Sequence, residues 1–303
     1  MRFTAEITLA GDCSPATVGG RVIAEAARAA EELGFDAISF NDHPIPSRKW
    51  LDAGGHDAHD PFAVLGFCAA ATQRLRLIPF AVILPHRNPF VLAKAFASLD
   101  VLSEGRTVAS VCVGYLRSEF EAVGVPFAER NDRFDEGVEA MRTAWEHPEG
   151  TSFVGRFFTA RNQVSTPPPV QRPLPIWISG NSRRSVERAG RYAQGWAPLI
   201  ISADKARTVR APAIPDLDAF AVRLDELRRV AGAAGRDAST IEVQAGGGPA
   251  AAGGDDLAAH TDWVRALADV GVTQHVIDCQ IGGRRDGLAE LRRFGDQVVS
   301  KLT

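Results

Sequence analysis

The regular alternation of strand-like and helix-like segments along the chain constrains its fold more than any other feature. A β-branched, alternating segment at residues 4–9 precedes an alanine-rich amphipathic segment at 17–33, which ends at Gly34, the usual residue after a helix. Further strands are expected at residues 37–40, 75–84, 107–113, 176–179, 196–200, 241–244 and 274–279. Eight strands, each followed by a helix, predict a (β/α)8 TIM barrel of the α/β class. A doubly wound parallel sheet is the structural alternative.

Capping residues mark where several of the intervening helices begin. Asp60-Pro61 and Asn88-Pro89 each place a capping side chain before a proline in the first turn. Helices are expected at residues 61–72, 89–102, 131–145, 181–192, 216–230, 255–270 and 286–299. Residues 149–174 are irregular, with a possible hairpin near 153–158, and we interpret them as an insertion between strands four and five. Residues 1–303 then form one domain, since a TIM barrel commonly has this length.

Charge and hydropathy narrow the class of protein. The chain is 45% hydrophobic, which is enough to build a large core, and its net charge of −3 leaves no basic excess for a nucleic-acid backbone. The longest apolar runs, such as residues 78–84, are too short to span a bilayer, and the first ten residues lack the pattern of a signal peptide. We therefore expect a cytoplasmic protein that binds neither nucleic acid nor membrane.

An aspartate and a histidine stand side by side where the second strand ends. The carboxyl ends of the strands carry the active site in a TIM barrel, so Asp42 and His43 are candidate functional residues. A histidine can hold or move a proton near neutral pH, and an adjacent carboxylate can orient a polar ligand group. The alternative is that Asp42 caps a turn and His43 is a surface residue.

The following loop contains further histidines and aspartates that could suggest a metal site. His56 and His59 lie in a glycine-rich stretch with no helix expected to hold them on one face, and no cysteine ligands accompany them. We interpret residues 44–59 as a solvated lid loop and expect no metal, although a metal-dependent barrel hydrolase is kept as an alternative. Trp50, in the same loop, could cover a ligand.

Two other strand ends carry glycine turns. Strand four leads into Gly114-Tyr115, and strand five ends at Ser179-Gly180-Asn181-Ser182 directly before a helix. A glycine lets a ligand approach the backbone, and free amides at a helix N-terminus bind anions. An ordinary capped helix start is the alternative.

Two longer stretches resemble the luciferase-like monooxygenase superfamily, barrel flavoenzymes that include many oxidoreductases dependent on the deazaflavin coenzyme F420. The first comprises RLRLIPFAVILPHRNPFVLAKAFASLDVLSEGR and, shortly after it, VGYLRSEFEAVGVPF. These are similar to the family's third strand, its Asn-Pro helix start and its Val-Gly-aromatic loop with a Glu-Phe. The second is PLPIWISGNSRRSVERAGRYAQGWAP, which is similar to the family's fifth strand and phosphate turn.

The resemblance implies roles for particular residues. Asp42 would contact the deazaflavin ring, and His43 would be the catalytic residue near the carbon that exchanges hydride. Phe80, Ala81 and Val82 would back the ring, where family members often have a bulge with a non-proline cis bond. The ribityl and phosphate portion would be received by Gly114, Tyr115, Ser179, Gly180, Asn181 and Ser182.

The function implied is a coenzyme F420-dependent oxidoreductase that transfers a hydride between the deazaflavin and a small organic substrate, as a homodimer. An FMN-dependent monooxygenase of the same fold is the alternative. Three places depart from the family pattern, namely Ile78-Pro79, Ser179-Gly180 and Gln194. They favour a third possibility, a barrel that binds its ligand without catalysis.

Overall fold

The predicted barrel is present, and its strands pair in the order expected for a TIM barrel. The computed structural model describes residues 1–303 except 10, 12, 209, 249–255, 282–285 and 303. Its parallel sheet has the order β3-β2-β1-β11-β10-β9-β8-β5-β4. β3 and β4 are two parts of the third barrel strand, and a bridge between Leu77 and Thr107 joins β3 to the segment before β5, so the sheet closes. The barrel strands are β1 (Arg2–Leu9), β2 (Ala37–Phe40), β3 (Arg76–Pro79), β4 (Val82–Ile83), β5 (Ala109–Cys112), β8 (Ile176–Ser179), β9 (Gly195–Ala197), β10 (Glu242–Gly246) and β11 (Gln274–Ile281).

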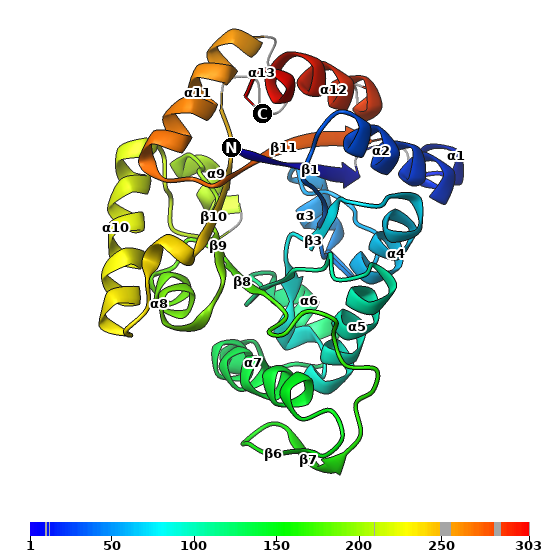
Figure 1. Ribbon diagram of the computed structural model, residues 1–303, viewed down its shortest axis with the longest axis vertical. Coiled ribbons are helices and arrows are strands. Elements are labelled where there is room, and N and C mark those ends of the chain that lie inside the picture. Colours follow the sequence, from blue (N-terminus) through cyan, green and yellow to red (C-terminus); the bar gives the residue numbers. More distant parts are fainter. Residues whose placement is uncertain (10, 12, 209, 249–255, 282–285, 303) are drawn as a thin grey trace.

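Helices surround this barrel, and β1 and β11 lie side by side where the first and last strands meet (Figure 1). Asp60 and Asn88 cap their helices through the predicted side-chain bonds to backbone N–H groups. The longer helices are α2 (Gly20–Glu32), α4 (Pro61–Ala71), α5 (Pro89–Leu102), α7 (Arg130–Glu146), α8 (Arg183–Tyr192), α10 (Leu217–Ala233), α11 (Leu257–Val270) and α12 (Gly287–Phe294). Short helices are α1 (Pro15–Val18), α3 (Arg48–Asp52), α6 (Arg117–Ala122), α9 (Ala203–Thr208) and α13 (Ser300–Leu302). No helix of the described residues has the length and apolar character needed to cross a membrane.

The insertion between strands four and five forms the predicted hairpin. β6 (Thr151–Val154) and β7 (Thr159–Gln163) pair antiparallel and lie beyond α7 in Figure 1, away from the barrel. Glu136 of α7 holds the turn, because its carboxylate accepts the backbone N–H groups of Arg156, Phe157 and Phe158. The hairpin is thus anchored to the helix that precedes it.

The third strand is not the continuous segment that its apolar run predicts. β3 ends at Pro79 and β4 begins at Val82, with a cis peptide bond between Phe80 and Ala81, as the family resemblance implied. Proline has no N–H for the ladder, and the Ile83 N–H donates to the carboxylate of Asp42. The third strand therefore breaks at the carboxyl end of the barrel, next to the candidate site.

Other predicted boundaries shift where the backbone finds a different partner. The helix expected at 17–33 is divided by Gly19, whose backbone is extended, and the helix expected at 286–299 ends at Phe294 and continues as a π-helical turn. The helix expected from Asn181 begins at Arg183 with Ser182 as its cap. The predicted start at Asp255 lies outside the described residues, and α11 begins at Leu257.

The barrel interior combines apolar and polar side chains. Ile78, Val108 and Trp177 are fully buried there, and Thr4 on β1 bonds Gln274 of the adjacent β11 and Gln244 of β10, the strand beyond it. The helix-face aromatics Phe96, Phe220 and Phe294 are buried in the layer between barrel and helices. Trp196 is also core, stacked 5.9 Å from Phe220.

Candidate functional site

The candidate site lies at the carboxyl ends of β2, β4 and β5, which the barrel topology brings together. Asn41, Asp42 and His43 directly follow β2, and Gly114 and Tyr115 follow β5. Only the closed parallel sheet places these segments next to one another, because they are far apart in the sequence. The structure therefore brings these two predicted groups of site residues together, and the turn after β8 lies beside β5, because Ser179 of β8 shares a hydrogen bond with Ser110 of β5.

Asp42 is held by protein groups. Its carboxylate accepts both Nη groups of Arg87, one at 2.8 Å from Oδ1, and the Ile83 N–H at 2.8 Å, and the residue is 4% exposed. A bidentate pair of this kind is a strong, directional contact. The side chain that we expect to contact a cofactor ring thus also holds Arg87 and the broken third strand in position.

His43 forms an ion-pair geometry with Glu119, a residue to which the sequence analysis gave no role. His43 Nδ1 lies 3.2 Å from Glu119 Oε2 and 3.3 Å from Oε1, and the Glu119 side chain is fully buried on α6. An N–H at Nδ1 that donates to this carboxylate leaves Nε2 as the atom that can accept or release a proton. Nε2 lies 3.5 Å from the Tyr115 hydroxyl.

Aromatic rings enclose His43. The Trp50 ring is 4.6 Å away, and the rings of His56 and Tyr115 are at 5.1 and 5.8 Å. Burial lowers the pKa of His56 to about 4 and raises the pKa of Tyr115 well above its ordinary value, so both rings are neutral near pH 7. This part of the loop differs from the expected solvated lid, because α3 carries Trp50 into a buried position against His43.

A second imidazole, that of His86, lies behind the pair. Its ring packs 4.4 Å from Phe120, and within the described chain neither ring nitrogen has a hydrogen-bond partner. Burial lowers the pKa of His86 to about 4, although Glu119 and Asp42 act in the opposite direction. Of the two imidazoles, it is therefore His43 that pairs with Glu119.

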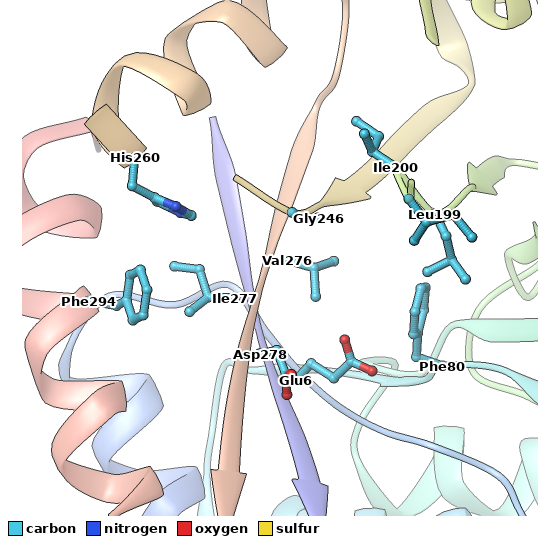
Figure 2. A pocket seen from close by; sticks show the side chains of 12 residues that line it. Glu6, Phe80, Leu199, Ile200, Gly246, His260, Val276, Ile277, Asp278 and Phe294 are labelled. Atoms are coloured by element: carbon cyan, nitrogen blue, oxygen red, sulfur yellow. The ribbon is translucent and has the colours of Figure 1, made fainter. Parts of the chain in front are cut away.

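A cavity adjoins this region on the side of β1, β10 and β11 (Figure 2). Phe80, Leu199 and Ile200 form an apolar wall, and Glu6 extends toward Phe80. The Asn41 amide, oriented to satisfy its neighbours, donates to Glu6 Oε1 and to the Phe80 carbonyl oxygen, each at 3.0 Å. The cavity thus connects through Asn41 to the segment that carries Asp42 and His43.

The turn after β8 provides free backbone donors, but its side chains are occupied. Asn181 donates to the carbonyls of Leu199 and Pro212 and accepts the Leu199 N–H, while Ser182 caps α8. Within the described residues the N–H groups of Asn181 and Ser182 have no partner, and the first turn of α8 adds its own free N–H groups. The start of α8 therefore fits an anion held by backbone amides alone.

The neighbouring glycines have structural reasons to be glycine. Gly180 has φ +123° and donates its N–H to Ala197, while Gly114 has φ +81°, and a Cβ there would lie 2.6 Å from Ile83 Cγ2. Ser179 shares a hydrogen bond of 3.1 Å with Ser110. A bulky substitution at Gly180 would strain the backbone, so it would not report cleanly on a ligand.

The histidines considered as metal ligands do not converge. His59 Nε2 lies 2.8 Å from the Val18 carbonyl oxygen, whereas His56 packs against Trp50 and His43. Among the described residues no group of three His, Cys, Asp or Glu side chains could hold a metal ion.

Sequence reasoning missed Glu119 and Arg87 as functional partners. Glu119 stands in the Glu-Phe pair of the family-like stretch, and the available signal was a carboxylate between apolar Leu116 and Phe120. Arg87 lies directly before the predicted helix cap Asn88, and this position predicts an ordinary surface residue. Arg87 follows the third barrel strand and Glu119 follows the fourth, so their contacts with Asp42 and His43 depend on the folded barrel and not on local sequence.

Comparison with known proteins identifies the family. A family model described as luciferase-like monooxygenase matches residues 5–280. An uncharacterized protein of Mycobacterium tuberculosis is 29% identical over 302 residues, covering 91% of this chain and 94% of that protein. An F420-dependent glucose-6-phosphate dehydrogenase of Kineococcus radiotolerans is 32% identical over 179 residues, which cover 57% of this chain and 51% of that protein.

Solved structures share the fold over the whole chain. The monooxygenase RslO1 from Streptomyces bottropensis has a TM-score of 0.78 at 23% identity, with all of both chains covered. An F420-dependent secondary alcohol dehydrogenase has a TM-score of 0.77 at 17% identity, with 99% of each chain covered. At this identity the likeness shows the fold alone.

Proposed function

Because the chain belongs to the luciferase-like monooxygenase family, we propose that it is a coenzyme F420-dependent oxidoreductase acting on a small organic substrate. The family and its neighbours are F420- or flavin-dependent oxidoreductases and monooxygenases, so the chain is an enzyme of this class. The observation that carries the proposed proton transfer is the His43–Glu119 pair at the barrel mouth. The choice of F420 rests on two relatives that match about half of their own length and are named as F420-dependent glucose-6-phosphate dehydrogenases.

The described residues fit a phosphorylated, planar cofactor. The backbone N–H groups of Asn181 and Ser182 would hold a phosphate, and Phe80 and Ala81 would lie against the ring at the break in the third strand. Gly114 and Tyr115 complete the approach on the β5 side. Bound coenzyme F420 would supply a two-electron hydride donor or acceptor.

The protein's own contribution is to hold and move one proton. Glu119 fixes the His43 ring through Nδ1 and stabilises the imidazolium, so Nε2 can give a proton to a substrate oxygen or take one from it. The rings of Trp50 and Tyr115 exclude water from this imidazole, which strengthens its interaction with the carboxylate. Asp42 and Arg87 position the backbone around Ile83.

Kinetics of variants test this assignment. His43→Ala should lower turnover about 10²- to 10⁴-fold with little change in cofactor affinity, because a positioned acid or base acts in the transition state. Glu119→Gln keeps the shape and a hydrogen-bond acceptor but loses the charge, and it should lower turnover about 10- to 100-fold. His59→Ala is the matched control, since this ring lies in the same loop and bonds the Val18 carbonyl oxygen; its turnover should stay within about twofold. Equal, small effects at His43 and His59 would refute the acid–base role.

An FMN-dependent monooxygenase is the second candidate, and the family description itself favours it. It differs from the first in its carrier, so cofactor binding separates the two. Four further expectations stay predictions: a small-molecule substrate, a homodimer, a single domain over residues 1–303 and a cytoplasmic location.

A further inference from the structure

Two arginines converge on one aromatic ring at the rim of the candidate site. The guanidinium carbon of Arg130 lies 3.9 Å from the centroid of Phe127, and that of Arg117 lies 4.6 Å from the same centroid. Arg117 is on α6, which also carries Glu119, and Arg130 begins α7. Cation–π contacts hold both side chains in place at modest energetic gain.

Among the residues that the structure describes, no carboxylate pairs with either arginine. Within the described part of the chain neither Arg117 nor Arg130 forms an ion pair, and the one side-chain bond of Arg130 goes to the Phe127 carbonyl. Other arginines, on α7, the hairpin and α8, have carboxylate partners: Arg133 pairs with Glu129, Arg156 with Asp132, and Arg184 with Asp132 and Asp135. Burial and the charge of Arg117 lower the pKa of Arg130. Two like charges held together without a counter-charge favour an anionic ligand.

The pair lies close to both parts of the proposed cofactor site. Phe127 packs 5.1 Å from Phe120, which lies 4.4 Å from His86 behind the His43–Glu119 pair. On the other side, Asn131 follows Arg130 and accepts hydrogen bonds from Arg188 of α8, the helix whose start offers free amides. The pair thus lies between α6, which carries Glu119, and the start of α7, which contacts α8.

We propose that Arg117 and Arg130, held on Phe127, bind the anionic carboxylate or phosphate chain of a ligand whose reactive part lies at His43. The proposal rests on the proposed function, in which that ligand is coenzyme F420. Beyond its phosphate this cofactor carries a chain of γ-linked glutamates, whereas FMN ends at its phosphate. The arginine pair would therefore favour F420 over FMN without touching the reacting atoms.

Binding titrations test the proposal without any turnover. Four full-length proteins are titrated at low salt: wild type, Arg117→Gln, Arg117→Gln/Arg130→Gln and the control Arg156→Gln. Each is titrated with three deazaflavins, namely full F420, the form without glutamates, and the alcohol that ends at the ribityl group. Arg156 is the matched control because it also lies over a ring, 4.7 Å from Phe157, but has a carboxylate partner. Circular dichroism shows that each variant is folded.

We expect the double variant to bind full F420 about 10- to 100-fold more weakly than wild type and Arg117→Gln to show a smaller loss, as lost charged hydrogen bonds predict. The ribityl alcohol should bind all four proteins equally, and Arg156→Gln should stay within about twofold of wild type. High salt should remove most of the difference, because Arg117 is exposed and Arg130 is only half-buried. A loss already seen with the form without glutamates would assign the pair to the phosphate.

Two results overturn different claims. Equal affinity of the wild type and the double variant for full F420 would refute the anion site and leave the proposed function standing. Failure of the wild type to bind any of the three deazaflavins would refute the proposed function itself.

Discussion

Removal of the Asp42 carboxylate should destabilise the fold more than any other single change at the barrel mouth. Asp42→Ala leaves the Arg87 guanidinium, whose side chain is 20% exposed, and the Ile83 N–H without their acceptor. Breaking a buried ion pair by removing one partner costs about 3–5 kcal/mol. Asp42→Asn retains one oxygen for Ile83 but turns an amide toward the guanidinium, so we expect a cost of about 2–3 kcal/mol.

Urea unfolding followed by far-UV circular dichroism measures these losses. Arg87→Met and the double variant Asp42→Ala/Arg87→Met complete a cycle, in which we expect a coupling free energy of about 1.5–3 kcal/mol. Asp60→Asn is the matched control, because Asp60 lies 3.7 Å from Arg87 but is exposed and caps α4, a task that asparagine also performs. A loss below about 1 kcal/mol for Asp42→Ala, or additivity in the cycle, would refute the positioning role.

Two further predictions concern the packing beside the site. His260 Nε2 lies 3.1 Å from His275 Nε2, and His275 Nδ1 lies 3.1 Å from the Ala245 carbonyl oxygen, an arrangement in which a neutral His275 donates through Nδ1 and accepts the His260 N–H. Burial lowers the pKa of His260 to about 4 and that of His275 to about 3, so the unfolded chain takes up protons before the folded chain does as the pH falls. The free energy of unfolding should therefore be at its full value above about pH 6.5 and decline toward pH 4, by about 1.4 kcal/mol per pH unit for each histidine. His260→Gln should reduce that slope in urea unfolding measured at several pH values. Gly114→Ala should cost about 1–3 kcal/mol in thermal unfolding, because Gly114 has φ +81° and a Cβ there would meet Ile83. Gly54 has a similar φ but open space around it, so Gly54→Ala should cost only about 1 kcal/mol. Equal losses in the two variants would contradict the crowding argument.

Local sequence signals predicted those parts of the fold whose partners are near in sequence. The strand at Ala37–Phe40 and the helix Pro89–Leu102 were predicted with their observed ends, since an apolar run and an Asn-Pro cap determine them locally. The third strand was predicted as continuous, because its apolar pattern does not show that Ile83 would bond Asp42. Periodicity describes burial, whereas strand ends depend on partners elsewhere in the chain.

The sequence predicted where the candidate residues lie in the barrel, but not the contacts that they make. His43 was chosen because it follows a strand, and position alone suffices for that in a barrel. Its partner Glu119 is 76 residues away, and the partner of Asp42 is 45 residues away, so no spacing rule connects them. Tertiary packing determines that Glu119 pairs with His43 and that Asp42 pairs with Arg87.

A fluorescence titration of the purified protein with coenzyme F420 and, separately, with FMN tests the central claim most directly. Our account predicts saturable F420 binding in the micromolar range or below, about 10-fold or more tighter than FMN at low salt, since only F420 has a carboxylate chain for Arg117 and Arg130. Micromolar FMN binding without detectable F420 binding would contradict it and favour the monooxygenase.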